Sequence, residues 1–139
     1  MTISELIRKL HSELQDKLPE FTVLLEDGTI RTQVHDSLET KGVVITVSKF
    51  ADRDPISENS GSFIREVKVP IVVRTNSSVE GAPDFNDVID KIEIVVCDIS
   101  ARAIQHKWEF VEMKSLEDPE STQCGYIILS HTYTKRGIV

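Results

Sequence analysis

The sequence is poor in residues that build disulfide-bonded, zinc-bound or membrane-embedded proteins. It contains two cysteines, Cys97 and Cys124, whose spacing matches neither a CxxC redox pair nor a zinc framework, so we expect reduced thiols. No apolar run approaches the roughly 20 residues that span a bilayer. The N-terminus is amphipathic from its start and lacks the basic and apolar regions of a signal peptide. These absences predict synthesis in the cytoplasm and no membrane partner.

Basic residues are in the minority. Asp and Glu outnumber Lys and Arg by 23 to 16, and the formal net charge is −7. Proteins that hold DNA or RNA tightly neutralise phosphates with clustered Lys and Arg, so this balance argues against tight nucleic-acid binding. The hydrophobic fraction of 40% is typical of a folded globular protein. At this length one core is enough, and we expect a single domain over residues 1–139.

Motifs of catalysis and metal binding are also missing. The histidines are His11, His35, His106 and His131, and none forms the HxH, HExxH or HxxxH spacing that places two nitrogens on one metal. The chain has no G-x-S-x-G elbow, no P-loop and no G-x-G-x-x-G motif. We therefore expect no catalytic residue, no metal and no cofactor, and we predict that the chain is not an enzyme.

The sequence does contain a clear amphipathic helix at residues 2–18. Its apolar residues recur at the i, i+3, i+4, i+7 spacing of one helical face. Thr2 and Glu5 form a T-x-x-E capping box, and Pro19 ends the helix.

A second helix is predicted for residues 84–99, with Asp84 as its N-cap. Its apolar residues share one stripe, although several of them also favour strands. Ile94 falls opposite that stripe, among Asp87, Asp90, Lys91 and Asp98. An exposed Ile there is a natural contact in an oligomer.

Strands are expected between and after these helices. Phe21–Glu26 and Thr29–Val34 flank Asp27-Gly28 and predict a hairpin with a type I′ turn, while residues 42–50 predict a buried strand. Residues 51–61 have turn chemistry and predict a loop.

The alternating segment 62–75 predicts a strand with one apolar face, interrupted on that face only by Arg65. Pro70 cannot donate a ladder hydrogen bond, so this strand is expected at an edge or bulged. A second loop, 76–83, follows it.

Two strands, 106–114 and 124–134, close the chain around a polar loop. Trp108 and Phe110 are expected on one face of the first, either as core residues or as a surface contact. The element order predicts a single α+β domain in which two helices pack on one antiparallel or mixed sheet.

This ordered pattern resembles the tail-terminator, or tail-completion, proteins of long-tailed bacteriophages, including the lambda-type minor tail family. The segments that carry the likeness are the helix Ile3–Leu18 with its terminal Pro and following hairpin, the strand Val43–Val47, the polar loop Asp52–Glu58, the strand Phe63–Val73, the helix Asp84–Ile99 and the closing strand Gly125–Tyr133.

The resemblance implies a virion protein at the head-proximal end of the tail. Six copies would form a ring that caps the tail tube, stops its polymerisation and presents its other face to the neck or connector. DNA would pass through the hole without tight binding, which suits an acidic chain. Loops 51–61 and 76–83 are the expected contact surfaces, with Arg53, Asp54, Glu58 and Arg65 as interface charges.

Two other functions remain open. A neck or head-completion connector has the same size and acidity but a different neighbour. A small enzyme or ligand-binding α+β domain would need polar residues on the inward strand faces, and those faces are almost wholly apolar here.

Overall fold

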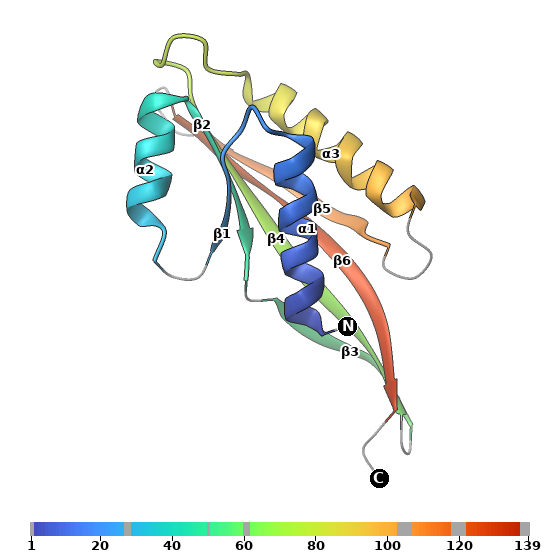
Figure 1. Cartoon of the computed structure of the whole chain (residues 1–139). Coiled ribbons are helices and arrows are strands. Elements are labelled where there is room, and N and C mark those ends of the chain that lie inside the picture. The colour runs from blue at the N-terminus through green and yellow to red at the C-terminus, as the bar shows by residue number, and fades with distance from the viewer. Residues whose placement is uncertain are drawn as a thin grey trace.

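The computed structural model describes residues 2–26, 29–49, 51–59, 62–102, 107–117 and 122–136. The helices within these ranges are α1 (Ile3–Lys17), α2 (Arg31–Thr40) and α3 (Phe85–Arg102). The strands are β1 (Val23–Glu26), β2 (Val43–Ser48), β3 (Asp52–Asn59), β4 (Ser62–Asn76), β5 (Glu109–Glu117) and β6 (Thr122–Arg136) (Figure 1). The predicted α+β fold class is confirmed. No helix in these ranges has the length and apolar character required to cross a bilayer.

All the strands belong to one mixed sheet in the order β1-β2-β4-β6-β5, and β3 also pairs with β4. β1 runs parallel to β2, whereas every other pair is antiparallel. β4 is the central strand. It pairs with β6 along its whole length, and its other side is shared by β2 and then β3.

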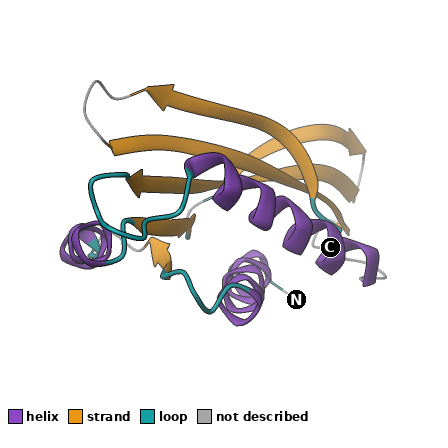
Figure 2. Cartoon of the chain, turned by 90° about the horizontal axis from the view of Figure 1, so that it is seen from above, coloured by secondary structure: helices purple, strands orange, loops and turns teal. Residues whose placement is uncertain are grey.

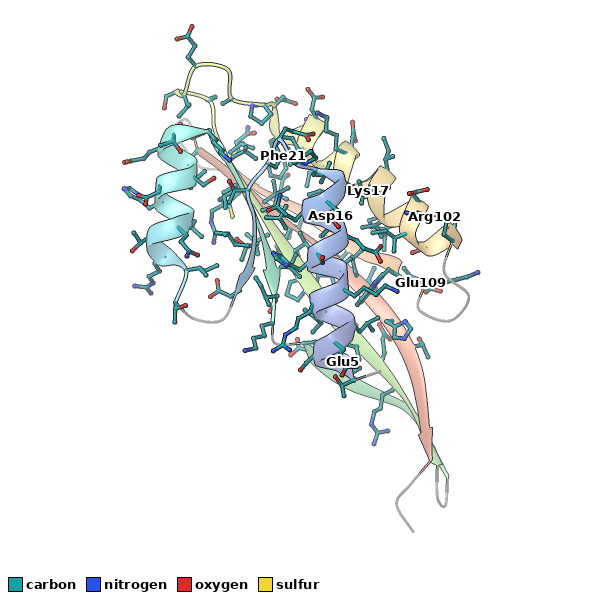
Figure 3. All side chains as sticks on the ribbon, in the orientation of Figure 1. Glu5, Asp16, Lys17, Phe21, Arg102 and Glu109 are labelled. Carbon is teal, nitrogen blue, oxygen red and sulfur yellow. The ribbon has the colours of Figure 1, made fainter. Side chains whose placement is uncertain are left out.

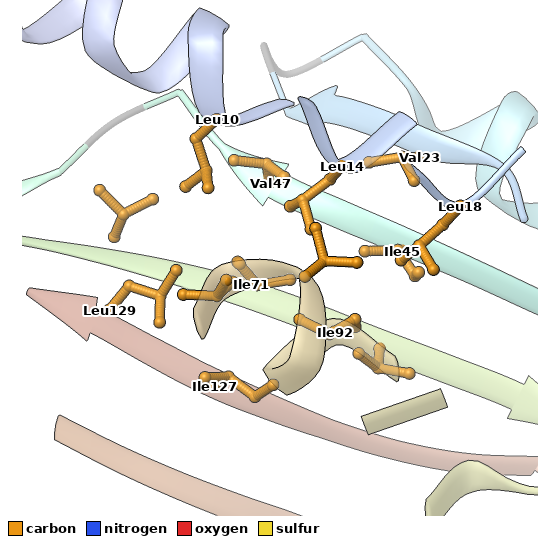
Figure 4. Close-up of a cluster of buried hydrophobic side chains, with 14 of the residues drawn as sticks. Leu10, Leu14, Leu18, Val23, Ile45, Val47, Ile71, Ile92, Ile127 and Leu129 are labelled. Carbon is orange, nitrogen blue, oxygen red and sulfur yellow. The ribbon is translucent and has the colours of Figure 1, made fainter. Parts of the chain in front are cut away.

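The core lies between one face of the sheet and the helices α1 and α3, which cover that face together (Figure 2). On β4 the predicted apolar face is confirmed, because Val67, Val69, Ile71 and Val73 are all buried. Figure 4 shows Leu10 and Leu14 of α1 and Ile92 of α3 meeting the strand residues Ile45, Ile71, Ile127 and Leu129. The stripe predicted for the second helix is buried in full, so its helical period outweighed its strand propensity. Its members are Phe85, Val88, Ile89, Ile92, Val95, Val96 and Ile99.

The first helix begins as its sequence predicts. The Thr2 hydroxyl accepts a hydrogen bond from the Glu5 amide, and the Glu5 carboxylate accepts one from the Thr2 amide. This capping box satisfies two amide groups that have no partner inside the helix. Near the other end the Leu18 amide donates to Leu14, and Pro19 follows.

The predicted hairpin after α1 is wrong in its second half. Residues 31–40 form α2, and β1 pairs with β2 in parallel; the turn residues Asp27-Gly28 lie outside the described ranges. Parallel neighbours need a crossover connection, and α2 supplies it. The signal was a short apolar stripe at Val34 and Leu38 followed by Gly42, whose φ of +73° suits a residue just after a helix end.

The predicted loop 51–61 is also wrong over most of its length. β3 pairs with β4 from Asp52 opposite Lys68 to Asn59 opposite Ser62. Its polar composition disfavours a strand when considered alone, but the long neighbour β4 supplies a partner for its backbone.

The position of Pro70 shows why an edge was the wrong prediction for β4. β4 is an interior strand, and Pro70 pairs with Ile128 of β6. On the other side of β4, the register with β2 ends at Ile71 and the register with β3 begins at Lys68. Pro70 therefore lies where the neighbour changes, so the missing amide donor coincides with a gap between two ladders.

The two closing strands are confirmed, with shifted ends. β5 runs to Glu117 and β6 begins at Thr122, so part of the predicted loop 115–123 is strand, and His106 lies outside the described residues. Trp108 is buried just before β5 begins, whereas Phe110 on β5 is exposed. Of the two predicted alternatives, Trp108 is therefore a core residue and Phe110 is a surface residue.

Candidate protein-interaction surfaces

Four of the predicted interface residues lie in one extension of the sheet. We call this extension the arm: β3 together with residues 62–68 of β4 and 130–136 of β6. Figure 1 shows the arm reaching beyond the helices. In its register Arg53 pairs with Val67, Asp54 with Glu66, Glu58 with Phe63, and Pro55 with Arg65. The tertiary structure therefore gathers Arg53, Asp54, Glu58 and Arg65 on two adjacent strands. Arg65 lies on a strand as predicted, whereas the other three lie on a strand instead of in the predicted loop.

The base of the arm is tied by a side-chain hydrogen bond across its two long strands. The Ser130 hydroxyl donates to the Glu66 carboxylate at 3.0 Å, and Ser130 is buried. Arg65 is half-buried beside it on β4. The two long strands of the arm are therefore joined by a side-chain contact as well as by their backbone ladder.

The second predicted contact loop, 76–83, lies at the opposite end of β4 (Figure 1). Asn76 shapes it: its side-chain oxygen accepts from the Ser78 amide at 3.1 Å and from the Ser78 hydroxyl at 2.6 Å, while its amide donates to Gly42. A strand as long as β4 spans about 45 Å. The two expected contact surfaces are therefore at opposite ends of an elongated subunit.

Ile94 is exposed, as its position opposite the apolar stripe predicts. Its side chain is 68% exposed on the outer face of α3, and Asp87, Asp90 and Asp98 are exposed on the same helix. Asp98 pairs with Arg102 at 2.8 Å. This outer face thus carries three aspartates together with Lys91 and Arg102 around Ile94, and the role of Ile94 in an oligomer remains a prediction.

The sequence predicted a strand near β5 but did not indicate that its side chains are exposed on both faces. Every residue from Glu109 to Ser115 is exposed, including Phe110 at 42%, Val111 at 48% and Met113 at 57%. Just before this strand, Trp108 is anchored to the end of α3, because its amide donates to the Ser100 hydroxyl and its carbonyl accepts from it. The signal was present in the sequence as apolar residues interleaved with Glu112 and Lys114, which we interpreted only through its aromatic residues.

The opposite edge of the sheet is covered by side chains of α1. The Gln15 side chain accepts from the Val23 amide and donates to the Phe21 carbonyl, both at 3.1 Å. The His11 ring donates from Nε2 to the Val23 carbonyl at 2.9 Å. Two side chains of α1 therefore satisfy the Val23 amide and carbonyl groups, which β1 turns away from β2.

No group of three or more His, Cys, Asp or Glu side chains in the described ranges is placed to hold a metal ion. His131 donates to the Lys107 carbonyl and lies 5.7 Å from the Trp108 ring, and His35 pairs with Glu39 on the surface of α2. Cys97 and Cys124 are free thiols. These contacts give each described histidine a structural partner.

Charged side chains cover the outer surfaces of α1 and α3. Figure 3 shows Glu5 at the end of α1 nearer the arm and Phe21 beyond its other end. Near Phe21 the Lys91 ammonium pairs with Glu20 at 3.5 Å and lies 5.2 Å from the centre of the Phe21 ring. Lys91 therefore links α3 to the chain that leaves α1.

No protein-family model and no curated protein sequence matches this chain.

Proposed function

We propose that this chain is a structural virion protein, a tail-terminator subunit whose ring caps a bacteriophage tail tube and offers a joining surface to the neck. The observation that carries the proposal is the pair of segments at opposite ends of β4, the arm and the loop 76–83, neither of which is covered by α1 or α3 in Figure 1. A ring placed between a tube and a neck needs subunits with a contact surface at each end. A subunit with the length of β4 supplies both on one rigid sheet.

The likeness to tail terminators keeps most of its elements but not all. The structure has five elements of the kind on which the resemblance depends, namely the opening helix α1, the buried strand β2, the alternating strand β4, the helix α3 and the final strand β6. The hairpin after the first helix is replaced by β1 and α2, and most of the polar loop after β2 is strand β3. The proposal therefore depends more on the two-ended shape than on the detailed order of elements.

The charge distribution supports a passage for DNA without tight binding. The chain carries a net charge of −7. Phosphates are repelled by such a charge, because binding them requires clustered Lys and Arg. In a ring of six copies, Ile94 on the outer face of α3 is the apolar contact that we assign to the neighbouring subunit.

A tube-growth assay tests the proposal. The full chain is mixed with growing tail tubes from the same virus, and tube lengths and tube ends are imaged by electron microscopy. We expect six-fold rings at the tube ends and arrested growth. Tubes that elongate at the same rate and carry no ring would refute the proposal.

Two matched charge reversals then locate the contact. Arg53→Glu alters the arm and is expected to weaken capping at least about tenfold, the usual loss for a charge at a buried contact. Arg31→Glu makes the same change at an exposed position of α2, which carries none of the assigned contacts, and should leave capping unchanged. If both variants lose capping to the same extent, the arm is not the surface that contacts the tube. If the chain binds isolated head connectors and does not bind tubes, it is a neck protein and not a tail terminator.

A further inference from the structure

β5 is an open edge strand that is exposed on both faces. It pairs with β6 on one side, and no described strand pairs with its other side. An unpaired strand edge is a ready template for another strand, and proteins usually cover or shorten such edges. The β1 edge is covered by Gln15 and His11, whereas β5 is nine residues long and displays Phe110, Val111 and Met113. The open edge therefore has both backbone groups and apolar side chains to offer.

We propose that this edge pairs with β5 of a second copy of the chain, in an antiparallel register with a two-fold axis at Met113. In this register Glu112 of one copy lies opposite Lys114 of the other, and the symmetry repeats that pair. Met113 lies opposite itself. Opposite charges placed directly across a strand pair stabilise it, and like charges destabilise it. The second copy is thus selected by charge complementarity as well as by apolar contact.

The alternation of side chains limits the registers that two identical strands can adopt. Directly opposed residues in an antiparallel pair point to the same face, so a two-fold axis must pass through a residue. An axis at Glu112 would oppose two glutamates, and an axis at Lys114 would oppose two lysines. An axis at Ser115 would place Met113 opposite Glu117. Only the axis at Met113 pairs opposite charges in this part of the strand.

The pairing of β5 with β6 limits the length of this register. A shift between Phe110 and Glu112 marks a bulge, after which the ladder is regular from Glu112 to Glu117, so the regular contact about Met113 covers residues 112–114 of each copy. Glu109, which the same register would oppose to Glu117, lies beyond the bulge. Glu112 pairs with Ile128 and Lys114 pairs with Tyr126, so both project from the outer face of the sheet. Met113 pairs with Ile127, whose side chain is in the core, so Met113 projects from the face that carries α1 and α3. The charge pairs and the methionine pair thus form on opposite faces of the joined sheet.

This inference does not rest on the proposed ring. The contact closes on two copies, because the same surface is used by both. It involves neither the arm nor the loop 76–83. Failure of the tube-growth assay would therefore leave it standing, and failure of the tests below would leave the tail-terminator proposal standing.

Charge swaps in the full chain test the register. Sedimentation equilibrium of the wild-type chain should show a species of twice the 15.7 kDa chain mass. Glu112→Lys and Lys114→Glu each place like charges opposite one another twice, and each should weaken dimerisation at least about tenfold. The double variant Glu112→Lys/Lys114→Glu restores opposite charges with their signs exchanged. It should dimerise close to the wild-type strength.

A cross-linking pair tests the axis independently. In a chain with Cys97 and Cys124 replaced by serine, Met113→Cys places two thiols directly opposite each other, within disulfide reach. Mild oxidation should yield a covalent dimer. Ser115→Cys is the matched control: its two copies lie four residues apart in the proposed register, about 14 Å along the strand, and should remain uncoupled.

Several outcomes would overturn the inference. These are a wild-type chain that stays monomeric at all concentrations, an assembly that neither single swap weakens, a double swap that fails to restore dimerisation, and preferential cross-linking of Ser115→Cys. Circular dichroism guards against unfolding, which we do not expect because both charged residues are exposed.

Discussion

The two edges of the sheet meet solvent differently. At β1, Gln15 and His11 of α1 bond to the amide and carbonyl groups of Val23 that face away from β2. At β5, both faces of the strand are exposed, and no described strand or helix lies along its outer side. β1 is the more apolar strand in sequence, Val-Leu-Leu-Glu, yet it is the covered one. The placement of a helix, more than strand composition, therefore decides which edge stays open.

The charged residues of β5 fit an edge that must remain soluble in the single chain. Glu112 and Lys114 interrupt its apolar residues, and charges of this kind limit indiscriminate strand pairing. The same charges select among registers when two identical strands meet. The same two charged residues thus limit non-specific strand pairing and favour one pairing register.

The largest expected effect comes from the helix that covers the β1 edge. Leu14 is fully buried between α1 and the sheet, and Leu14→Ala should lower the free energy of unfolding by about 3 kcal/mol through lost burial and the cavity left behind. Met113→Ala on the open β5 should change the stability of the monomer by less than about 0.5 kcal/mol. Urea denaturation of both variants measures the contrast. Equal losses would show that β5 is buried.

A somewhat smaller loss is expected where β5 and β6 meet the start of α3. A Cβ added at Gly125 would lie 2.5 Å from the Phe85 ring and 2.7 Å from the Lys114 carbonyl oxygen. Because one of these atoms is backbone, Gly125→Ala should destabilise the fold by about 2 kcal/mol. Thermal unfolding measures the loss. The control is Gly81→Ala, whose Cβ would meet nothing within 4 Å, although its φ of +79° adds some strain.

Removing the hydrogen bond between Gln15 and Val23 tests most directly whether the β1 edge is covered while the β5 edge is open. Gln15→Leu leaves the Val23 amide without its side-chain acceptor, so the free energy of unfolding should fall by about 1.5 kcal/mol. Hydrogen exchange of the Val23 amide should also accelerate. Gln33→Leu, the same change at an exposed position of α2, should alter neither quantity. An unchanged Val23 exchange rate would mean that Gln15 does not seal this edge.

The smallest effect is expected at the start of α1, far along the helix from Gln15. Thr2→Ala removes the hydroxyl half of the capping box and should destabilise the chain by about 1 kcal/mol. Ser12→Ala on the exposed side of the same helix is the control and should have little effect. Chemical denaturation compares the two. A Thr2→Ala variant as stable as the control would show that the helix start contributes nothing to the fold.

Sequence patterns were sufficient where a segment carries its own signal. The capping box and apolar stripe predicted α1, the stripe of seven residues predicted α3, and alternation predicted the buried face of β4. The exposure of Ile94 followed from the same helical period. These properties repeat within a few residues along the chain, so no distant partner is needed to see them.

The errors fall where a distant partner decides the structure. Asp27-Gly28 indicated a hairpin, but Val23–Glu26 found its partner in β2, and α2 became the crossover. Residues 52–59 have the composition of a loop, but they form a strand because their backbone pairs with that of β4. The predicted interface residues on this segment lie across the β3–β4 ladder from the part of β4 that holds Arg65, but their local structure was predicted wrongly, and their role at an interface stays a prediction.

By itself, the sequence determined the apolar faces of two helices and two strands, the absence of catalytic spacing motifs and the exposure of one isoleucine, because these depend on local periodicity. Only the tertiary structure decided the order of strands, the formation of the arm and the openness of β5. Backbone amides and carbonyls are alike in every residue except proline, which lacks the amide donor, so which of them become paired, capped or left at an open edge depends on what the fold places beside them.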